Sequence, residues 1–322
     1  MKYRDFGRTG MKVSVLGMGC WQAGMQSWGN DYSTDDIHEA IKTSSQAGVN
    51  FFDTAEIYGK GVSERTLATA LKDDNIYIAT KVAGFNGGNA EKSAKLSYER
   101  LGRPIDLYQL HWVPSYYTGI KKAIRSLENC VRSGWVRHIG VSNFPLAELQ
   151  IAIESTEKED VVSDQLEFSI ADRRLENGLM EFTRKNGVEI IAYSPLGRGM
   201  LTGKYRQTGP PKDFARRFYS GKRKYLQTEL LDAIHTIAEK HSCGDAEVSL
   251  AWVISKGALP IPGAKNRTQA EGNARSSEVS LKKEEIDTID RLSLGFKEGT
   301  YRNIVPRVVP DVLVKSFTSL GI

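Results

Sequence analysis

Four side chains that could exchange protons lie between residues 53 and 111. Asp53 ends the apolar run of the segment FFDTAEIYG, and Tyr58 follows five positions later. Lys81 and His111 stand near the ends of two further apolar runs, IYIATKV and DLYQLHW. A carboxylate, a phenol, an ammonium group and an imidazole could together hold and release a proton. Singly, each has a structural explanation, because Asp53 could form a cap or turn, Lys81 could lie on the surface and His111 could be a hydrogen-bonded core residue.

The elements that would carry these residues alternate along the chain. Short apolar, β-branched runs are separated by segments of helical periodicity, which predicts βαβ units and a parallel sheet. Residues 33–48 begin with a Ser/Thr/Asp capping signal, and residues 118–134 have apolar residues at helical spacing and end at Gly134. Eight runs are predicted as strands, the number that closes a barrel: residues 15–21, 50–54, 76–82, 106–112, 136–143, 161–168, 188–195 and 258–263.

We therefore expect an α/β protein whose residues 1–322 form one domain, a (β/α)8 TIM barrel. We also expect an N-terminal hairpin around GRTG and a long cofactor-covering loop after the seventh strand, residues 197–226. Chemistry in such barrels occurs at the C-terminal ends of the strands. Unrelated structural roles would scatter polar residues over both ends, so their gathering at one end indicates a functional site. The residues at these ends are Asp53, Lys81, His111, Ser142, Asn143, Gln165, Tyr193 and Ser194.

Composition and charge exclude several other classes of protein. The chain is 40% apolar and 26% charged, as in ordinary globular proteins. Its net charge of +5 suits an anionic small ligand as readily as a nucleic acid. The three cysteines have no CxxC spacing and the five histidines show no HxH or HExxH pattern, so we expect neither a disulfide framework nor a metal. Without a signal peptide or a membrane-length apolar run, the sequence predicts a cytoplasmic protein with no membrane partner.

Two segments resemble motifs of other functions, but neither match is adopted. The segment GMGCWQAG partly matches a dinucleotide fingerprint, but Gln22 stands where the third glycine would fall. The basic, aromatic stretch 211–225 could be a nucleic-acid patch. Its position after the seventh strand instead favours a loop over an anionic cofactor, and we expect no nucleic-acid partner.

The motifs FDTAEIYG, ATK, LYQLHW, GVSNF, DQLEFS, YSPLGRGMLTGKY and PIPGAKNRTQAEGN resemble those of the aldo-keto reductases, in the same order and over nearly the whole chain. The resemblance implies a (β/α)8 barrel that binds NADPH without a Rossmann fold and reduces aldehydes or ketones. It also implies that Asp53, Tyr58, Lys81 and His111 are catalytic. Tyr58 would donate the proton, and Lys81 would favour its phenolate and so lower its pKa. Asp53 would keep Lys81 charged, and His111 would orient the carbonyl oxygen or join the proton relay.

The same resemblance implies a cofactor site. Ser142, Asn143 and Gln165 would bind the nicotinamide carboxamide, Tyr193 would stack on the ring, and the segment 194–199 would cover the pyrophosphate. Trp21 and Trp112 would wall the substrate pocket. The full set of implied cofactor residues is Trp21, Ser142, Asn143, Gln165, Tyr193, Ser194, Leu196, Gly197, Arg198, Gly263, Lys265, Arg267, Gln269 and Asn273.

The chain departs from many relatives near the adenosine end of this site. Gly272 stands where many have an acidic residue, and Gln269 where some have an arginine. Cofactor choice then depends on Lys265 and Arg267, two cations that could pair with a 2′-phosphate, so we expect NADP(H) to be favoured over NAD(H). The family also includes potassium-channel beta subunits, which serve mainly as binding partners, and a partner-binding barrel is therefore the alternative. The substrate and the oligomeric state stay open.

Overall fold

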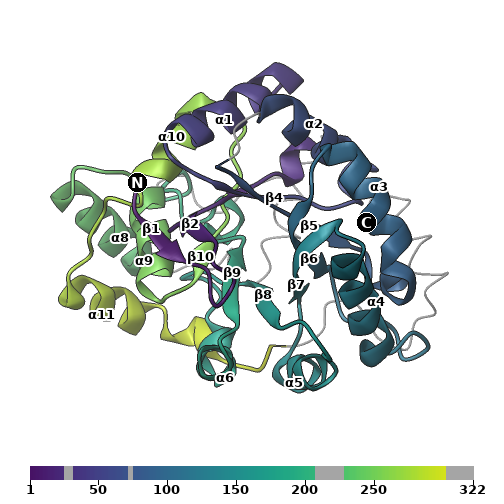
Figure 1. The fold of residues 1–322 in the computed structure, drawn as a ribbon. Helices are drawn as coiled ribbons and strands as arrows, with labels where there is room; N and C mark the ends of the chain where they lie inside the picture. The colour runs from purple at the N-terminus through teal and green to yellow at the C-terminus, as the bar shows by residue number, and fades with distance from the viewer. Residues whose placement is uncertain (25–31, 72–74, 207–227, 302–322) are drawn as a thin grey trace.

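A computed structural model of the protein describes residues 1–24, 32–71, 75–206 and 228–301. Eight strands form one parallel sheet in the order β10-β9-β8-β7-β6-β5-β4-β3, surrounded by helices (Figure 1). The edges close where Gly17 N and Gly19 N donate to Pro260 O and Pro262 O at 2.9 and 3.1 Å. The expected (β/α)8 barrel is confirmed. Its strands are β3 Met18–Gly19, β4 Phe51–Asp53, β5 Tyr77–Val82, β6 Ile105–Leu110, β7 Val136–Ser142, β8 Val161–Glu167, β9 Glu189–Tyr193 and β10 Leu259–Pro260.

The helices lie on the outside of the barrel. Helix α1 shows how local sequence fixes an end: Ser33 Oγ accepts from Asp36 N at 3.1 Å, and the Asp36 carboxylate accepts from Ser33 N at 2.7 Å. Such caps stabilise a helix by about 0.5–2 kcal/mol. The α-helices are α1 Thr34–Gln46, α2 Val62–Ala70, α3 Ala90–Leu101, α4 Ile120–Arg132, α5 Leu146–Glu154, α6 Leu179–Asn186, α8 Thr228–Lys240, α9 Asp245–Ser255, α10 Arg267–Arg275 and α11 Lys283–Leu292. Short 3-10 helices are η1 Trp21–Ala23, η3 Gly84–Asn89, η4 Arg174–Glu176, η5 Gly197–Gly199 and η7 Leu294–Lys297.

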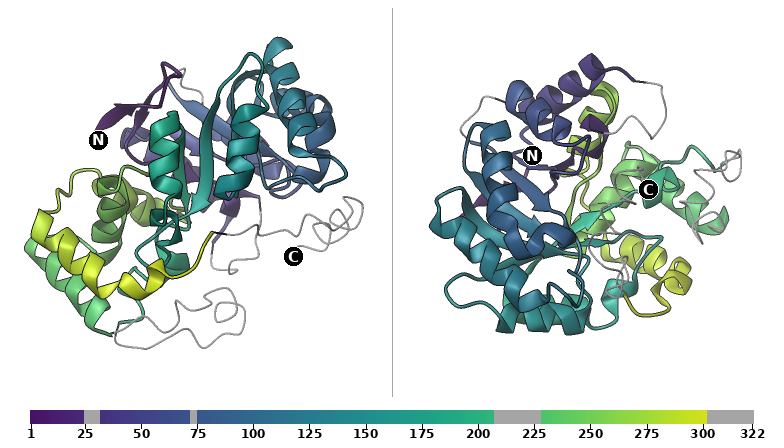
Figure 2. Two further views of the ribbon diagram at one scale, coloured as in Figure 1. Left: turned by 90° about the horizontal axis from the view of Figure 1, so that it is seen from below. Right: turned by 90° about the vertical axis from the view of Figure 1, so that its right-hand side faces the viewer.

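The expected N-terminal hairpin covers one end of the barrel. Strands β1 Tyr3–Asp5 and β2 Lys12–Ser14 pair antiparallel and lie across the barrel in Figure 1 and at one end of it in Figure 2. Phe6, at the hairpin turn, stacks on Phe51 with ring centroids 5.6 Å apart. These residues belong to an apolar cluster that fills this end of the barrel. The polar residues at the carboxyl ends of the strands are therefore at the opposite end.

The core between barrel and helices follows the apolar spacing of the sequence. In α4, for example, Ile120, Ile124 and Leu127 are buried, as the periodicity of residues 118–134 predicts. Fully burying a large aliphatic side chain contributes about 1.5–3 kcal/mol. This packed shell gives the strand ends a rigid support. The single-domain assignment of residues 1–322 stays a prediction.

The first and last barrel strands are shorter than expected. Strand β3 is confined to Met18–Gly19 because the chain turns into η1 after Cys20, whose N–H donates to Asp53 O at 2.8 Å. Strand β10 ends at Pro260, since prolines at 260 and 262 have no N–H to donate to a sheet. After the seventh barrel strand the described chain runs to residue 206 and begins again at residue 228. The rest of the expected loop 197–226 and the basic stretch 211–225 lie outside the described residues.

Candidate active site

The four candidate catalytic residues come together at the carboxyl ends of neighbouring strands. Asp53 ends β4, Lys81 is the penultimate residue of β5, and His111 directly follows β6. Lys81 Nζ donates to Asp53 Oδ2 at 2.6 Å and lies 5.2 Å from the ring centroid of Tyr58. Tyr58 OH is 3.5 Å from His111 Nε2. Parallel pairing thus brings residues far apart in sequence into one cluster.

The charged pair at the base of this cluster is buried and hydrogen-bonded. Lys81 has an exposed fraction of 0% and Asp53 of 2%. Burial alone would lower the pKa of Lys81. The opposite effects of Asp53 and, more weakly, of Tyr58 together outweigh burial, so the pKa is raised and the ammonium persists. Asp53 Oδ1 accepts from Gln165 Nε2 at 2.8 Å and, more weakly, from Gln109 Nε2 at 3.4 Å. Both carboxylate oxygens therefore have partners, as a buried charge requires.

The phenol and the imidazole are uncharged near neutral pH. Burial raises the pKa of Tyr58 above its usual value, and the opposing effect of Lys81 is smaller. The net direction differs from our expectation, because the extent of burial is not visible in the sequence. Burial, with a further contribution from Lys81, holds the pKa of His111 well below its usual range. A protonated phenol and a neutral imidazole are both able to donate a hydrogen bond to an oxygen.

Two glycines let η1 pack against the turn that carries Tyr58. Gly59 has a φ of +59°, and a Cβ there would lie 2.1 Å from Gly24 O. A Cβ on Gly24 would lie 2.4 Å from the carbonyl of Tyr58. Only glycine fits such contacts at both places. Trp21, the first residue of η1, is partly exposed.

Trp112 lies beside His111, with ring centroids 5.0 Å apart. It packs tightly over Gly84, where a Cβ would lie 2.5 Å from the indole, and Phe85 is 5.8 Å from it between centroids. Trp112 is partly exposed. Trp112 and Phe85 thus lie on the histidine side of the cluster, and the assignment of Trp21 and Trp112 to a substrate pocket stays a prediction.

Three expected carboxamide-binding residues lie together at the ends of β7 and β8. Ser142 and Gln165 are paired across the two strands, and Ser142 Oγ donates to Gln165 O at 2.9 Å. Asn143 has a φ of +61°, a left-handed conformation that asparagine tolerates better than most residues. Its Nδ2 donates to His111 O and to Ser142 Oγ, each at 3.0 Å. These contacts fix the amide of Asn143 next to the histidine.

Two tyrosine hydroxyls meet on the other side of the same amide. Tyr193, at the end of β9, donates to Asn143 Oδ1 at 2.9 Å, and Tyr301 donates to the same oxygen at 2.8 Å. Tyr301 is 8% exposed and also lies 3.5 Å from Glu167 N. Tyr301 could not be predicted as a site residue, because the tail after Phe296 has no informative sequence pattern.

The expected pyrophosphate segment forms a tight turn after β9. Ser194, Gly197 and Arg198 have φ values of +52°, +56° and +58°, and Gly197 N donates to Ser194 O at 2.9 Å. Leu196 O accepts from Gly199 N at 3.0 Å. Arg198 pairs with Glu167 at 3.2 Å. The arginine is thus already held beside the end of β8.

The residues expected near the adenosine end surround the start of α10. Asn266 caps the helix, since its Oδ1 accepts from Gln269 N at 3.0 Å. Gln269 Oε1 accepts from Lys265 N at 2.9 Å, and Asn273 Nδ2 donates to Gly263 O at 3.2 Å. The structure therefore brings Lys265 and Gln269 together at the start of α10, and Asn273, further along the helix, contacts Gly263.

The two cations at this helix have different surroundings. Lys265 Nζ lies 4.9 Å from the ring centroid of Tyr32. Arg267 is 65% exposed and pairs with Glu271 at 2.7 Å and, more distantly, with Glu39 at 3.8 Å. Glu271 thus pairs with the arginine that we expect to contribute to the preference for NADP(H). The sequence alone did not indicate this pair.

Two further residues near the charged pair were missed. Gln109 could have been found from strand alternation, because it shares a face of β6 and its extension with His111. Cys20 follows β3. Burial raises the pKa of its thiol, and the negative charge of Asp53 raises it further, by a smaller amount. Its place just past the end of a barrel strand was the available signal.

The described part of the chain contains no group of three or more His, Cys, Asp or Glu side chains that could hold a metal ion. Among the described helices, none combines the length and apolar character needed to cross a membrane.

Comparison with known proteins agrees with this fold. The model of the Aldo/keto reductase family matches residues 15–294. An uncharacterized oxidoreductase of Mycobacterium tuberculosis is 33% identical over 311 residues, which cover 92% of this chain and 94% of that protein. The aldo-keto reductase yakc [NADP(+)] of Schizosaccharomyces pombe is 31% identical, with 84% and 85% covered. The solved aldo-keto reductase Tm1743, in complex with epalrestat, has a TM-score of 0.76 at 30% identity, with 91% and 100% covered.

This chain belongs to the aldo/keto reductase family and is an oxidoreductase.

Proposed function

We propose that this protein reduces aldehydes or ketones to alcohols with NADPH, and that Tyr58 donates the proton. The observation that carries the proposal is the position of Tyr58 OH, 3.5 Å from His111 Nε2 and above the buried pair of Lys81 and Asp53. NADPH supplies a hydride when it is bound. Charge then develops on the carbonyl oxygen, and a donor beside that oxygen lowers the barrier.

Each of the four residues has a separate part in moving this proton. Tyr58 keeps its proton until the oxygen becomes basic, in keeping with its raised pKa. Lys81 stabilises the phenolate left behind, and Asp53 keeps Lys81 charged and fixed. His111, neutral because of burial, orients the carbonyl oxygen by a hydrogen bond. Its Nδ1 is buried and has no hydrogen-bond partner among the described residues, so no hydrogen bond holds the proton on Nδ1, and Nε2, which faces Tyr58 OH, can carry it.

The chain also has the donors and acceptors that such a cofactor requires. Ser142, Asn143 and Gln165 bring two side-chain amides and a hydroxyl together at the ends of β7 and β8, next to His111, which fits a carboxamide. We assign Tyr193 to stacking, and the turn 194–199 with Arg198 to the pyrophosphate. Trp21 and Trp112 border the substrate.

Recognition of the adenosine phosphate is assigned to the start of α10. A helix N-terminus and two cations, Lys265 and Arg267, favour an anion there. The yeast relative is named for NADP(+), in keeping with this assignment. We therefore propose that NADP(H) is favoured over NAD(H). Glu271 pairs with Arg267 and makes this preference smaller than two unpaired cations would give.

A substrate screen tests the proposed reaction. Purified protein is mixed with NADPH and a panel of aromatic and aliphatic aldehydes and ketones, and cofactor absorbance is followed. Steady, carbonyl-dependent loss of NADPH is expected. Saturable NADPH binding without turnover on any carbonyl would instead favour the second candidate, a cofactor-binding barrel that serves partners as potassium-channel beta subunits do.

The cellular setting is proposed on narrower grounds. The three cysteines are unpaired, and Cys20 and Cys130 are buried. Free thiols persist in reducing compartments, which supports a cytoplasmic location.

A further inference from the structure

Asn143 has every hydrogen-bonding position of its side chain in use. Its Oδ1 has two lone pairs, and the hydroxyls of Tyr193 and Tyr301 donate to it at 2.9 and 2.8 Å. Its Nδ2 has two hydrogens, which His111 O and Ser142 Oγ accept, each at 3.0 Å. A further donor can therefore reach Asn143 Oδ1 only if one tyrosine hydroxyl moves away.

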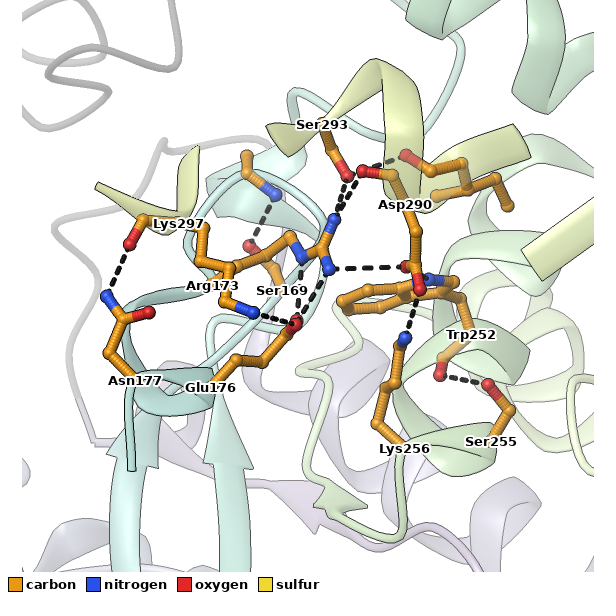
Figure 3. A network of polar contacts seen from close by, with 12 residues as sticks. Ser169, Arg173, Glu176, Asn177, Trp252, Ser255, Lys256, Asp290, Ser293 and Lys297 are labelled. Atoms are coloured by element: carbon orange, nitrogen blue, oxygen red, sulfur yellow. Dashed lines mark hydrogen bonds and ion pairs between the residues drawn. The ribbon is translucent and has the colours of Figure 1, made fainter. Parts of the chain in front are cut away.

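The chain segment that carries Tyr301 is anchored to the barrel by a network around Arg173 (Figure 3). Arg173 is 3% exposed and donates to Ser293 Oγ at 2.8 Å and to Asp290 O at 2.7 Å. It also forms a two-point pair with Glu176, at 2.6 and 2.7 Å. The C-terminal end of α11 is thus fixed to the loop that follows β8.

The next residues are held more lightly. Asn177 Nδ2 donates to Lys297 O at 2.6 Å (Figure 3). The same nitrogen donates to Gly299 O at 2.8 Å. The Arg174 guanidinium lies 5.3 Å from the ring centroid of Tyr301. Arg173 N also donates to Phe296 O at 2.9 Å. Beyond Phe296, the described main-chain contacts of the segment that carries Tyr301 come from the Asn177 side chain.

We propose that Tyr301 is an affinity-determining residue of the cofactor site, whose hydroxyl competes with the nicotinamide carboxamide for Asn143 Oδ1. The inference rests on the proposed function, in which Asn143 binds that carboxamide. It extends the site to residues 293–301, a segment that includes the start of the tail after Phe296, for which the sequence indicates no role.

The hydroxyl that leaves Asn143 Oδ1 in this proposal is that of Tyr301, not that of Tyr193. Tyr193 is fixed in β9, where it pairs with Glu167 and accepts from Phe168 N at 3.3 Å. Tyr301 has no strand or helix to hold it, and Gly299, with a φ of +89°, precedes it closely. Movement of Tyr301 requires changes in a short irregular segment, whereas movement of Tyr193 would disturb the barrel.

The test is Tyr301→Phe, which removes the competing hydroxyl and keeps the ring. Dissociation constants for NADPH are measured by fluorescence titration of the wild type and the variant. Because the cofactor no longer has to break this hydrogen bond, the variant should bind NADPH roughly two- to tenfold more tightly. A purely structural role would give weaker binding. The matched control is Tyr3→Phe. It removes a hydroxyl of the N-terminal hairpin that donates to Gly48 O at 3.0 Å, and it should leave the affinity for NADPH unchanged.

Hydrogen exchange provides a second readout. In the wild type, saturating NADPH should speed exchange of the amides of residues 294–300, whereas in Tyr301→Phe these amides should exchange quickly with or without cofactor. If the variant does not fold, Asn177→Ala, which loosens the same segment without touching Asn143, takes its place with the same expected direction.

The outcomes separate this inference from the function on which it rests. Unchanged or weaker NADPH binding in Tyr301→Phe, with normal binding by the wild type, overturns the role of Tyr301 alone. Failure of the wild type to bind either NADPH or NADH overturns both.

Discussion

Lys81 and Asp53 form an ion pair of 2.6 Å in which the side chains are 0% and 4% exposed. Removing one member of such a pair leaves the other charge buried, at a cost of about 3–5 kcal/mol. Lys81→Met should therefore lower the free energy of unfolding by this amount in urea denaturation. The double variant Lys81→Met with Asp53→Asn should regain much of the loss, since no buried charge is left. A double variant as unstable as Lys81→Met would show that the charge is not the cause.

The activities of the same variants should order differently from their stabilities. Lys81→Met should reduce turnover as much as loss of Tyr58, because the phenolate loses its stabilising ammonium. Asp53→Asn should be milder, since the ammonium persists but is less well held. Steady-state assays with NADPH and an aldehyde compare the two. Normal aldehyde reduction by folded Lys81→Met would contradict the role given to the ammonium.

Much of this site could be predicted from the sequence, because the barrel rule places strand ends together. Asp53, Lys81 and His111 each stand at the end of an apolar run, and parallel pairing brings them into contact. Other contacts depend on the register of the strands, which the sequence does not show. Gln165, for example, donates to Asp53 from the other side of the barrel at 2.8 Å. No local pattern encodes that distance.

Two other features depend on tertiary burial. The net pKa direction of Tyr58 follows from how deeply the phenol is buried, which no spacing reveals. Tyr301 reaches Asn143 from 158 positions away, through a segment without periodicity. Its contact depends on how α11 and the loop after β8 pack together, not on any motif.

Cofactor choice is expected to depend on the balance of charges at α10. Lys265→Ala with Arg267→Ala should weaken NADPH binding and scarcely alter NADH binding. The loss of NADPH binding free energy should not exceed that of two charge-assisted contacts, about 1.5–3 kcal/mol each. Because Arg267 is exposed, we expect a loss near the lower end of this range. The preference should also shrink as salt screens these charges. Titration with both cofactors measures the effect, and Lys185→Ala, an exposed lysine on α6, is the control.

The acidic partner of Arg267 provides the converse test. Glu271→Gln releases the arginine from its 2.7 Å pair and should tighten NADPH binding by a few-fold, with NADH binding unchanged. Equal wild-type affinities for NADPH and NADH would contradict the phosphate site at α10.

Asp164 is expected to make the protein less stable as the pH rises above about 4. Burial raises the pKa of this carboxyl well above its usual value, against a weaker effect of Phe144 N, and Oδ2 has no hydrogen-bond partner among the described residues. Above about pH 4 the unfolded chain releases this proton while the folded chain retains it. The contribution to stability therefore declines, by up to about 1.4 kcal/mol per pH unit, until the folded pKa is reached.

Asp164→Asn removes this titration and keeps a similar shape. Its free energy of unfolding should fall less than that of the wild type between pH 5 and pH 8, as measured by urea denaturation at each pH. Asp287→Asn, on the exposed face of α11, is the control and should follow the wild type. Parallel pH dependence of Asp164→Asn and the wild type would mean that Asp164 ionises in the folded protein.

The most direct test of the central claim compares the wild type with Tyr58→Phe in two assays on the same preparations. One assay follows NADPH absorbance with the best carbonyl substrate, and the other measures the NADPH dissociation constant. Loss of a general acid typically costs ~10² to 10⁴ in rate. We predict a loss of this size in turnover, with cofactor affinity within a few-fold of the wild type. Wild-type turnover by Tyr58→Phe would contradict the account.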